Sequence, residues 1–93
     1  MAFNSVLTPK SQRDIDRNWQ YLEEQKNGLG HDFLYHVQEC ITSLESNPFL
    51  WQVVEDNFRR AIIRRFNHQL WYEVVDQEII VIRVLGSSQD VNL

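Results

Sequence analysis

Four arginines stand close together in the last third of the chain, where cationic side chains could hold an anion. They are Arg59, Arg60, Arg64 and Arg65. No acid lies between Asn57 and Tyr72, so this window is strongly basic although the whole chain carries −4. The planar guanidinium fork suits phosphate and carboxylate groups, which makes clamping of an anion one interpretation. The other interpretation, which we favour, is a structural role, in which the arginines pair across strands with Glu73, Glu78 or Asp56 or extend along the sheet edge.

Three further side chains near the cluster could take part in chemistry. His68 titrates in the range useful for proton transfer, although a position in a short turn would leave it merely solvated. Tyr72 could stack on a base or donate a proton, whereas a tyrosine inside a strand most often belongs to the core. Arg83 stands among apolar neighbours and needs either a partner or a ligand. The weak catalytic candidates are therefore Arg60, Arg64, His68 and Tyr72, and the candidate residues for binding a partner molecule are Arg59, Arg60, Arg64, Arg65 and Arg83.

The arginines fall in a stretch rich in β-branched and aromatic residues, which is typical of strands. Three strands are predicted, at residues 59–66, 69–75 and 78–85, and Asp76-Gln77 forms a two-residue hairpin connection between the last two. Both faces of the final strand are largely apolar, which predicts an interior position in the sheet.

Alternation along these strands assigns the side chains to faces. It places Arg60 and Arg64 on one face of the first strand, and Arg59 and Arg65 on the other. In the final strand, Ile79, Val81, Arg83 and Leu85 share one face.

The N-terminal half predicts a strand followed by two helices. Phe3 to Leu7 is a short strand at a sheet edge, and a helix begins with Thr8 as N-cap and runs to about Lys26. After a connection at Leu29-Gly30, apolar residues repeat at helical spacing from Phe33 to Ser46. A short extended piece is predicted within residues 49–54.

This order predicts a single α+β domain over residues 1–93. An antiparallel hairpin of two helices packs on one face of a mainly antiparallel sheet of three to five strands. The other face is left uncovered and carries arginines, and the polar tail Gly86 to Leu93 is expected to be loose.

Composition narrows the class of protein. With 43% hydrophobic residues, no apolar run long enough to cross a bilayer and no signal-peptide block, the chain is expected in the cytoplasm. Cys40 is the only cysteine and is interpreted as a small buried apolar residue. No metal-binding motif and no cofactor-binding loop is present, and His31 and His36 are assigned no chemistry. The acidic net charge disfavours a nucleic-acid-coating protein.

Several motifs in order resemble the RelE/ParE superfamily of toxins from type II toxin–antitoxin modules, often labelled plasmid stabilisation proteins. The matching features are an early aspartate in the first helix (Asp14), the EEQ…GLG…F junction (Glu23 to Phe33), an NP pair (Asn47-Pro48), an RR pair (Arg59-Arg60), the aromatic positions Phe66 and Tyr72, and an I-V-I-x-V-L strand (Ile80 to Leu85). The resemblance covers nearly the whole chain.

The resemblance implies a small cytoplasmic toxin that binds a cognate antitoxin as a hetero-oligomer. Relatives of one type cut messenger RNA on the ribosome, and relatives of the other type poison DNA gyrase, so fold alone does not choose between them.

The chain departs from the family pattern at places that matter for RNA cleavage. Phe66-Asn67-His68 stands where F-P-Y is common, Gln69 takes the place of an arginine, and residues 85–91 lack the usual histidine and arginines. A ribosome-dependent endoribonuclease is therefore disfavoured. The main hypothesis is a growth-inhibiting toxin, and the alternative is an attenuated or inactive toxin-fold interaction domain without catalytic activity.

Overall fold

The computed structural model describes residues 2–93 and forms one five-stranded sheet with two helices. The elements are β1 (Asn4–Leu7), α1 (Pro9–Gln25), α2 (Leu29–Ser46), β2 (Val53–Glu55), β3 (Phe58–Ile63), β4 (His68–Val75) and β5 (Glu78–Leu85). The strand order is β1-β5-β4-β3-β2; β1 runs parallel to β5, and the other neighbours are antiparallel. The predicted α+β architecture is confirmed, with the first strand at an edge and the last one in the interior.

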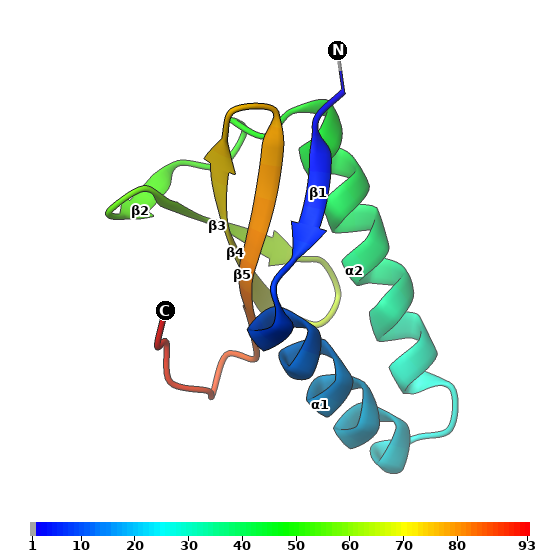
Figure 1. Cartoon of the computed structure of the whole chain (residues 1–93). Coiled ribbons are helices and arrows are strands. Elements are labelled where there is room, and N and C mark those ends of the chain that lie inside the picture. Colours follow the sequence, from blue (N-terminus) through cyan, green and yellow to red (C-terminus); the bar gives the residue numbers. More distant parts are fainter. Residues whose placement is uncertain (1) are drawn as a thin grey trace.

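The helices lie on one side of the sheet (Figure 1). Their apolar stripes meet the inner face of the sheet in a single core, and burial of this apolar surface is the main force that holds the layers together. Helix residues Ile15, Phe33, Val37, Ile41 and Leu44 pack there with strand residues Ala61, Ile63, Leu70, Tyr72, Ile79, Val81 and Val84. We call this the helix-covered face of the sheet, and the opposite side the outer face.

The first helix begins as predicted, whereas the second begins earlier. Thr8 is the N-cap of α1, and its hydroxyl oxygen accepts a hydrogen bond from the N–H of Ser11 at 3.1 Å. Leu29, predicted to lie in the connection, is the first residue of α2. The reason lies in Glu23, whose carboxylate accepts hydrogen bonds from the N–H groups of Gly28 and Gly30, each at 3.0 Å. These bonds satisfy backbone donors at the start of α2 and lower the pKa of Glu23.

The turn before β4 differs from the prediction. Strand β3 ends at Ile63 instead of Phe66, because Arg65 (φ 76°) and Asn67 (φ 58°) adopt left-handed conformations that cannot continue a strand. Arg64 and Arg65 therefore belong to a turn, and the predicted alternation of faces does not apply to them. The Asp76-Gln77 hairpin connection is found as predicted.

A β-bulge in the β4–β5 hairpin changes the face of the sheet to which the later side chains of β5 point. Trp71 pairs with Arg83 but Tyr72 pairs with Val81, so Ile82 has no partner in the register. After the bulge, Val84 points into the core, and Arg83 shares the outer face with its partner Trp71. The predicted grouping of Arg83 with Val81 is therefore wrong.

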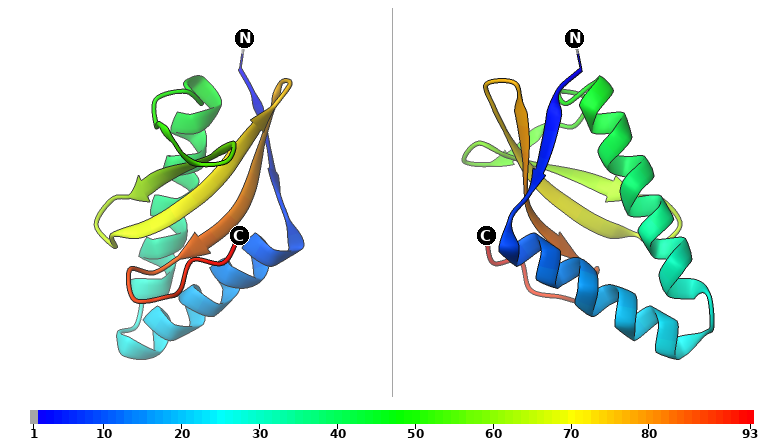
Figure 2. Two further views of the ribbon diagram at one scale, coloured as in Figure 1. Left: turned by 90° about the vertical axis from the view of Figure 1, so that its left-hand side faces the viewer. Right: turned by 45° about the vertical axis from the view of Figure 1, so that its right-hand side comes forward.

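The tail after β5 is not loose, and the outer face is not fully open. Figures 1 and 2 show the tail turning back on the side of the sheet away from α2. The carbonyl oxygen of Asn92 accepts a hydrogen bond from Nη1 of Arg83, and the side chain of Gln89 accepts one from the N–H of Gly86. The predicted free arginine face is thus partly occupied by the chain itself.

Candidate functional site

Helix α1 completes the edge of β5 with side chains where β1 stops. Strand β1 pairs only as far as Val81, which leaves the end of β5 without a neighbouring strand. The carboxylate of Asp14 accepts a hydrogen bond from the N–H of Val84 at 3.0 Å, and the amide of Asn18 donates to the carbonyl of Val84 at 3.3 Å. Two polar side chains one helical turn apart are therefore buried because they replace a strand.

The same carboxylate binds Arg83. Nε of Arg83 donates to Oδ2 of Asp14 at 2.6 Å, and Nη2 donates to Oδ1 at 3.0 Å, which is the two-point geometry of a strong ion pair. Only 8% of Arg83 and 2% of Asp14 are exposed. The hydrogen bonds to Asp14 raise the pKa of Arg83. The guanidinium therefore has a partner inside the chain, which is one of the two possibilities that the sequence left open for Arg83.

His68 is not a solvated turn residue. Its Nδ1 lies 3.0 Å from the carbonyl oxygen of Phe66, and its Nε2 lies 3.1 Å from Oδ1 of Asn18. The ring also packs against Phe33, with centroids 4.9 Å apart. Burial lowers the pKa of His68, and the Phe66 carbonyl opposes that effect in part. Both nitrogens face oxygen atoms of the protein, so the ring is not positioned to take a proton from a bound substrate.

Tyr72 belongs to the core, in agreement with its structural interpretation. It is fully buried, and its hydroxyl donates to the carbonyl oxygen of Pro48 at 2.7 Å. Burial raises the pKa of Tyr72 to about 12. A hydroxyl in this position is inaccessible as a general acid at neutral pH.

Two of the four clustered arginines have partners within the chain. Arg59 donates to the carbonyl oxygen of Trp51 at 2.6 Å and lies over the ring of Phe49. Arg65 forms an exposed ion pair with Asp32 at 2.8 Å. Within residues 2–93, the ion pairs do not include the acids that the sequence had suggested on neighbouring strands.

Arg60, in β3, and Arg64, in the turn after it, flank a groove beside the part of β3 that lies beyond its short pairing with β2. Two adjoining hollows, of about 280 and 580 Å³, share the side chains of Leu50, Trp51 and Ile62. Arg60 lines the smaller hollow and Arg64 the larger one. We call this the arginine-flanked groove. Arg60 also lies over the ring of Trp71, 5.6 Å from its centroid.

The groove is more apolar than the arginine cluster alone suggested. Leu50 is 62% exposed, and the neighbouring Phe49 is 57% exposed. In the larger hollow, α2 contributes His36, Glu39 and Cys40, and burial raises the pKa of Cys40 to about 11. The sequence predicted only a short extended piece within residues 49–54 and gave this segment no part in a site. The signal was the apolar run itself, most of which precedes the three-residue strand β2.

Two classes of site are not formed by the described part of the chain. Residues 2–93 hold no cluster of three or more histidine, cysteine, aspartate or glutamate side chains that could bind a metal ion. No helix in the same range has the length and apolar character needed to cross a membrane.

The fold is that of the RelE/ParE toxins. It is similar to the chromosomal ParDE system of P. aeruginosa (TM-score 0.77, 17% identity, covering 91% of this chain and 96% of that one). It is also similar to the RelBE2 toxin–antitoxin complex of Mycobacterium tuberculosis (TM-score 0.70, 18% identity, 92% and 99%) and to the E. coli RelBE complex (TM-score 0.65, 13% identity, 95% and 100%). No curated protein matched the chain in sequence.

Residues 6–91 match the family described as the ParE toxin of the type II toxin–antitoxin system parDE. Because this match spans almost the whole chain, the protein belongs to the ParE toxin family, and the predicted membership of the superfamily is confirmed.

Replacement of Asp14 by Asn should destabilise the protein by roughly 3 kcal/mol, because Arg83 would keep its charge in a nearly buried site without a counter-ion. The measurement is urea unfolding at neutral pH. Asp16→Asn, on the exposed side of the same helix, should change the free energy of unfolding by less than about 0.5 kcal/mol. Equal stability of the two variants would contradict the role given to the ion pair.

The stability of the protein should fall on mild acidification because of His68. Its pKa in the folded chain is below the ordinary value of 6.5, so the unfolded chain binds the proton first as the pH falls. The stabilisation is present above about pH 6.5 and is lost progressively below it. Unfolding at about pH 7 and about pH 5.5 should differ less in His68→Gln than in wild type, whereas the exposed His31→Gln should match wild type. An NMR titration that gives His68 a pKa above 6.5 would show that its two oxygen contacts outweigh burial.

Proposed function

We propose that this ParE-family toxin arrests growth by binding a macromolecular target without cutting RNA, and that an antitoxin neutralises it at the arginine-flanked groove. The target class favoured is DNA gyrase over ribosome-bound messenger RNA, and the compartment is the cytoplasm. The observation that carries the proposal is the groove, where exposed apolar side chains lie beside two arginines that have no acidic partner among residues 2–93.

The groove has the composition of a protein-binding surface. Specific interfaces combine an apolar centre with a polar rim and are enriched in tryptophan and arginine. Here Leu50, Trp51 and Ile62 form the centre, and Arg60 and Arg64 stand at the rim. An exposed apolar surface of this kind indicates an interaction site on a small protein.

The charges at the rim indicate the chemistry of the occupant. Arg60 and Arg64 are the two clustered arginines that lack an ion pair or hydrogen bond within the described residues. A segment that buries apolar side chains in the groove and places carboxylates beside these two arginines would fit. We therefore expect the antitoxin segment to be acidic and amphipathic.

The positions of the catalytic candidates argue against RNA cleavage. Attack by the 2′-hydroxyl needs a base, an acid and cations that reach the same phosphate. His68 and Tyr72 both point into the protein and use their polar atoms there. Arg60 and Arg64 remain accessible, but neither is suited to proton transfer because arginine keeps its proton. An accessible cation without a partner base fits binding better than catalysis.

Expression of the protein alone should arrest bacterial growth, and co-expression of the small protein encoded beside it should restore growth. The mechanism can be read from two assays with the purified chain. We expect inhibition of DNA supercoiling by gyrase and no cleavage of ribosome-bound messenger RNA. Cleaved RNA would contradict the binding mechanism. Absence of arrest with a folded, soluble protein would instead favour the inactive interaction domain.

The groove can be tested separately from toxicity. Leu50→Asp adds a negative charge where an acidic segment is expected to bind, and should weaken antitoxin binding by about tenfold or more, as expected for like charges brought together at an interface. Because Leu50 is exposed, folding should be unaffected. Val75→Asp, at an exposed position outside the lining of the groove, is the matched control. Calorimetric titration that shows equal antitoxin affinity for both variants would place the antitoxin elsewhere.

A further inference from the structure

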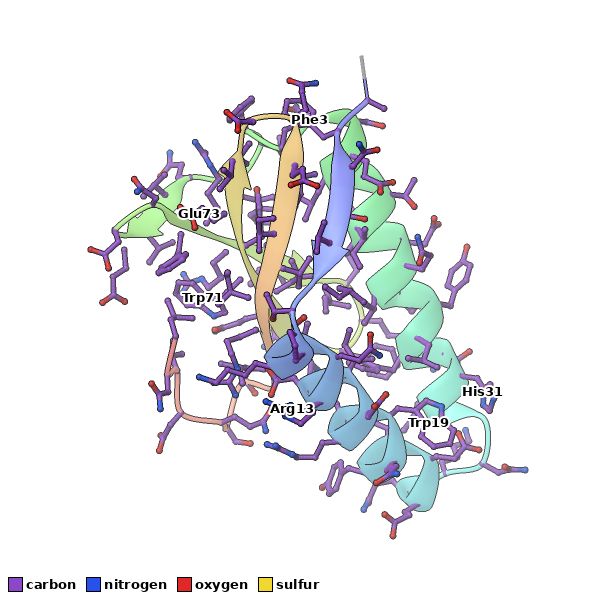
Figure 3. All side chains as sticks on the ribbon, in the orientation of Figure 1. Phe3, Arg13, Trp19, His31, Trp71 and Glu73 are labelled. Carbon is purple, nitrogen blue, oxygen red and sulfur yellow. The ribbon has the colours of Figure 1, made fainter. Side chains whose placement is uncertain are left out.

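The exposed side of α1 carries a line of three cations. Lys10, Arg13 and Arg17 are all exposed, and their spacing of three and four residues places them on one side of the helix. Figure 3 shows Arg13 projecting from α1 on the side away from α2. We call these three residues the basic stripe. It is a separate surface from the arginine-flanked groove, because the helix that lines the groove is α2.

The charges of the basic stripe are not compensated within residues 2–93. The ion pairs of this part of the chain include none of the three cations, and they do not include Asp16 and Glu24, the exposed acids of the same helix. Like charges three or four residues apart repel each other along a helix. Cations in the first half of a helix also oppose its dipole, and the first turn of α1 contains no acid. Both effects weaken the helix, so the stripe does not serve folding.

The composition around the basic stripe fits a phosphate backbone better than a protein. A protein partner buries apolar side chains at the centre of its interface. This side of α1 offers no aliphatic side chain, and next to the stripe stand Gln20 and Tyr21, which is 61% exposed. Arginine, lysine, glutamine and tyrosine are all side chains that contact phosphate and sugar groups in DNA complexes. The stripe spans about 10 Å along the helix, over which one strand of duplex DNA places about three phosphates.

We propose that the basic stripe binds the phosphate backbone of duplex DNA held by the target enzyme. The proposal rests on the proposed function, in which the target is DNA gyrase. Three cations bind DNA weakly by themselves, since neutralising few phosphates releases few counter-ions. Combined with a contact to the enzyme, the same weak contact raises the overall affinity, because the second binding event is then intramolecular.

The net charge of the chain agrees with such an accessory role. The protein carries −4 in total, so the chain outside the stripe is acidic and repels DNA. The stripe can therefore hold DNA that an enzyme presents to this side of α1, and the toxin is still not a general DNA-coating protein.

Direct binding of DNA tests the chemistry of the stripe. The affinity of the wild-type chain for a labelled duplex, measured by fluorescence anisotropy at low salt, should fall with salt concentration with a logarithmic slope of about −3, one for each cation. Arg13→Gln combined with Arg17→Gln should reduce the slope to about −1 and weaken binding at least about tenfold. Because both side chains are exposed, the fold should be unaffected.

A matched control removes one charge from elsewhere on the same helix. Lys26→Gln changes the exposed C-cap of α1 and should keep the slope at about −3, whereas Arg17→Gln should give about −2. Equal slopes in these two variants, or a wild-type slope of about zero, would overturn the stripe as a phosphate-binding surface. Binding of duplex RNA at least about tenfold tighter than duplex DNA would overturn the assignment to DNA.

Binding to gyrase separates a DNA contact from a protein contact. Arg17→Gln should weaken the affinity for DNA-loaded gyrase about threefold or more and leave the affinity for DNA-free gyrase unchanged, whereas Lys26→Gln should match wild type in both. Equal weakening with both forms of the enzyme would show that the stripe contacts protein, and unchanged affinity with both would exclude the stripe from the complex. If the wild-type chain binds duplex DNA with the expected slope but does not bind gyrase, the proposed function is overturned and the stripe remains a phosphate-binding surface.

Discussion

One carboxylate, that of Asp14, determines how the first helix, the last strand and the tail fit together. It accepts a backbone hydrogen bond from Val84 and two from the guanidinium of Arg83. A buried carboxylate needs such donors, since leaving it unpaired away from water would be very unfavourable. Helix α1 is thereby fixed along the edge of β5 where β1 ends. Arg83, held from below by Asp14, presents its remaining nitrogen to Asn92 and so anchors the tail as well.

The sequence predicted features that depend on local patterns. Helical spacing, the Thr8 N-cap and the two-residue connection at Asp76-Gln77 were all found as expected, because each depends on neighbouring residues. The bulge at Ile82 could not be found in this way, since one extra residue leaves the alternation of types intact while it reverses every later face. The role of α1 was equally hidden. Asp14 and Asn18 have the composition of a solvent-facing helix surface, and only the short length of β1 makes them edge-completing residues.

The sequence identified the residue types that could form a site, but it did not show which atoms surround each of them in the fold. Arginine, histidine and tyrosine were correctly recognised as groups that can do chemistry, but their availability depends on which oxygen atoms the fold places beside them. His68 meets Asn18 across the chain, and Tyr72 meets Pro48. Both contacts join residues far apart in sequence, so no local pattern signals them. The arginines without such contacts are Arg60 and Arg64, which flank the groove.

The tail after β5 has no histidine, lysine or arginine, and it turns back toward Arg83 (Figure 2). A tail without cations adds no charge to bind phosphate, yet its backbone carbonyl can still satisfy Arg83. The guanidinium is consequently turned from a group that could act on a ligand into one that holds the chain's own end. The end of the chain is thus held by a side chain that Asp14 holds in turn.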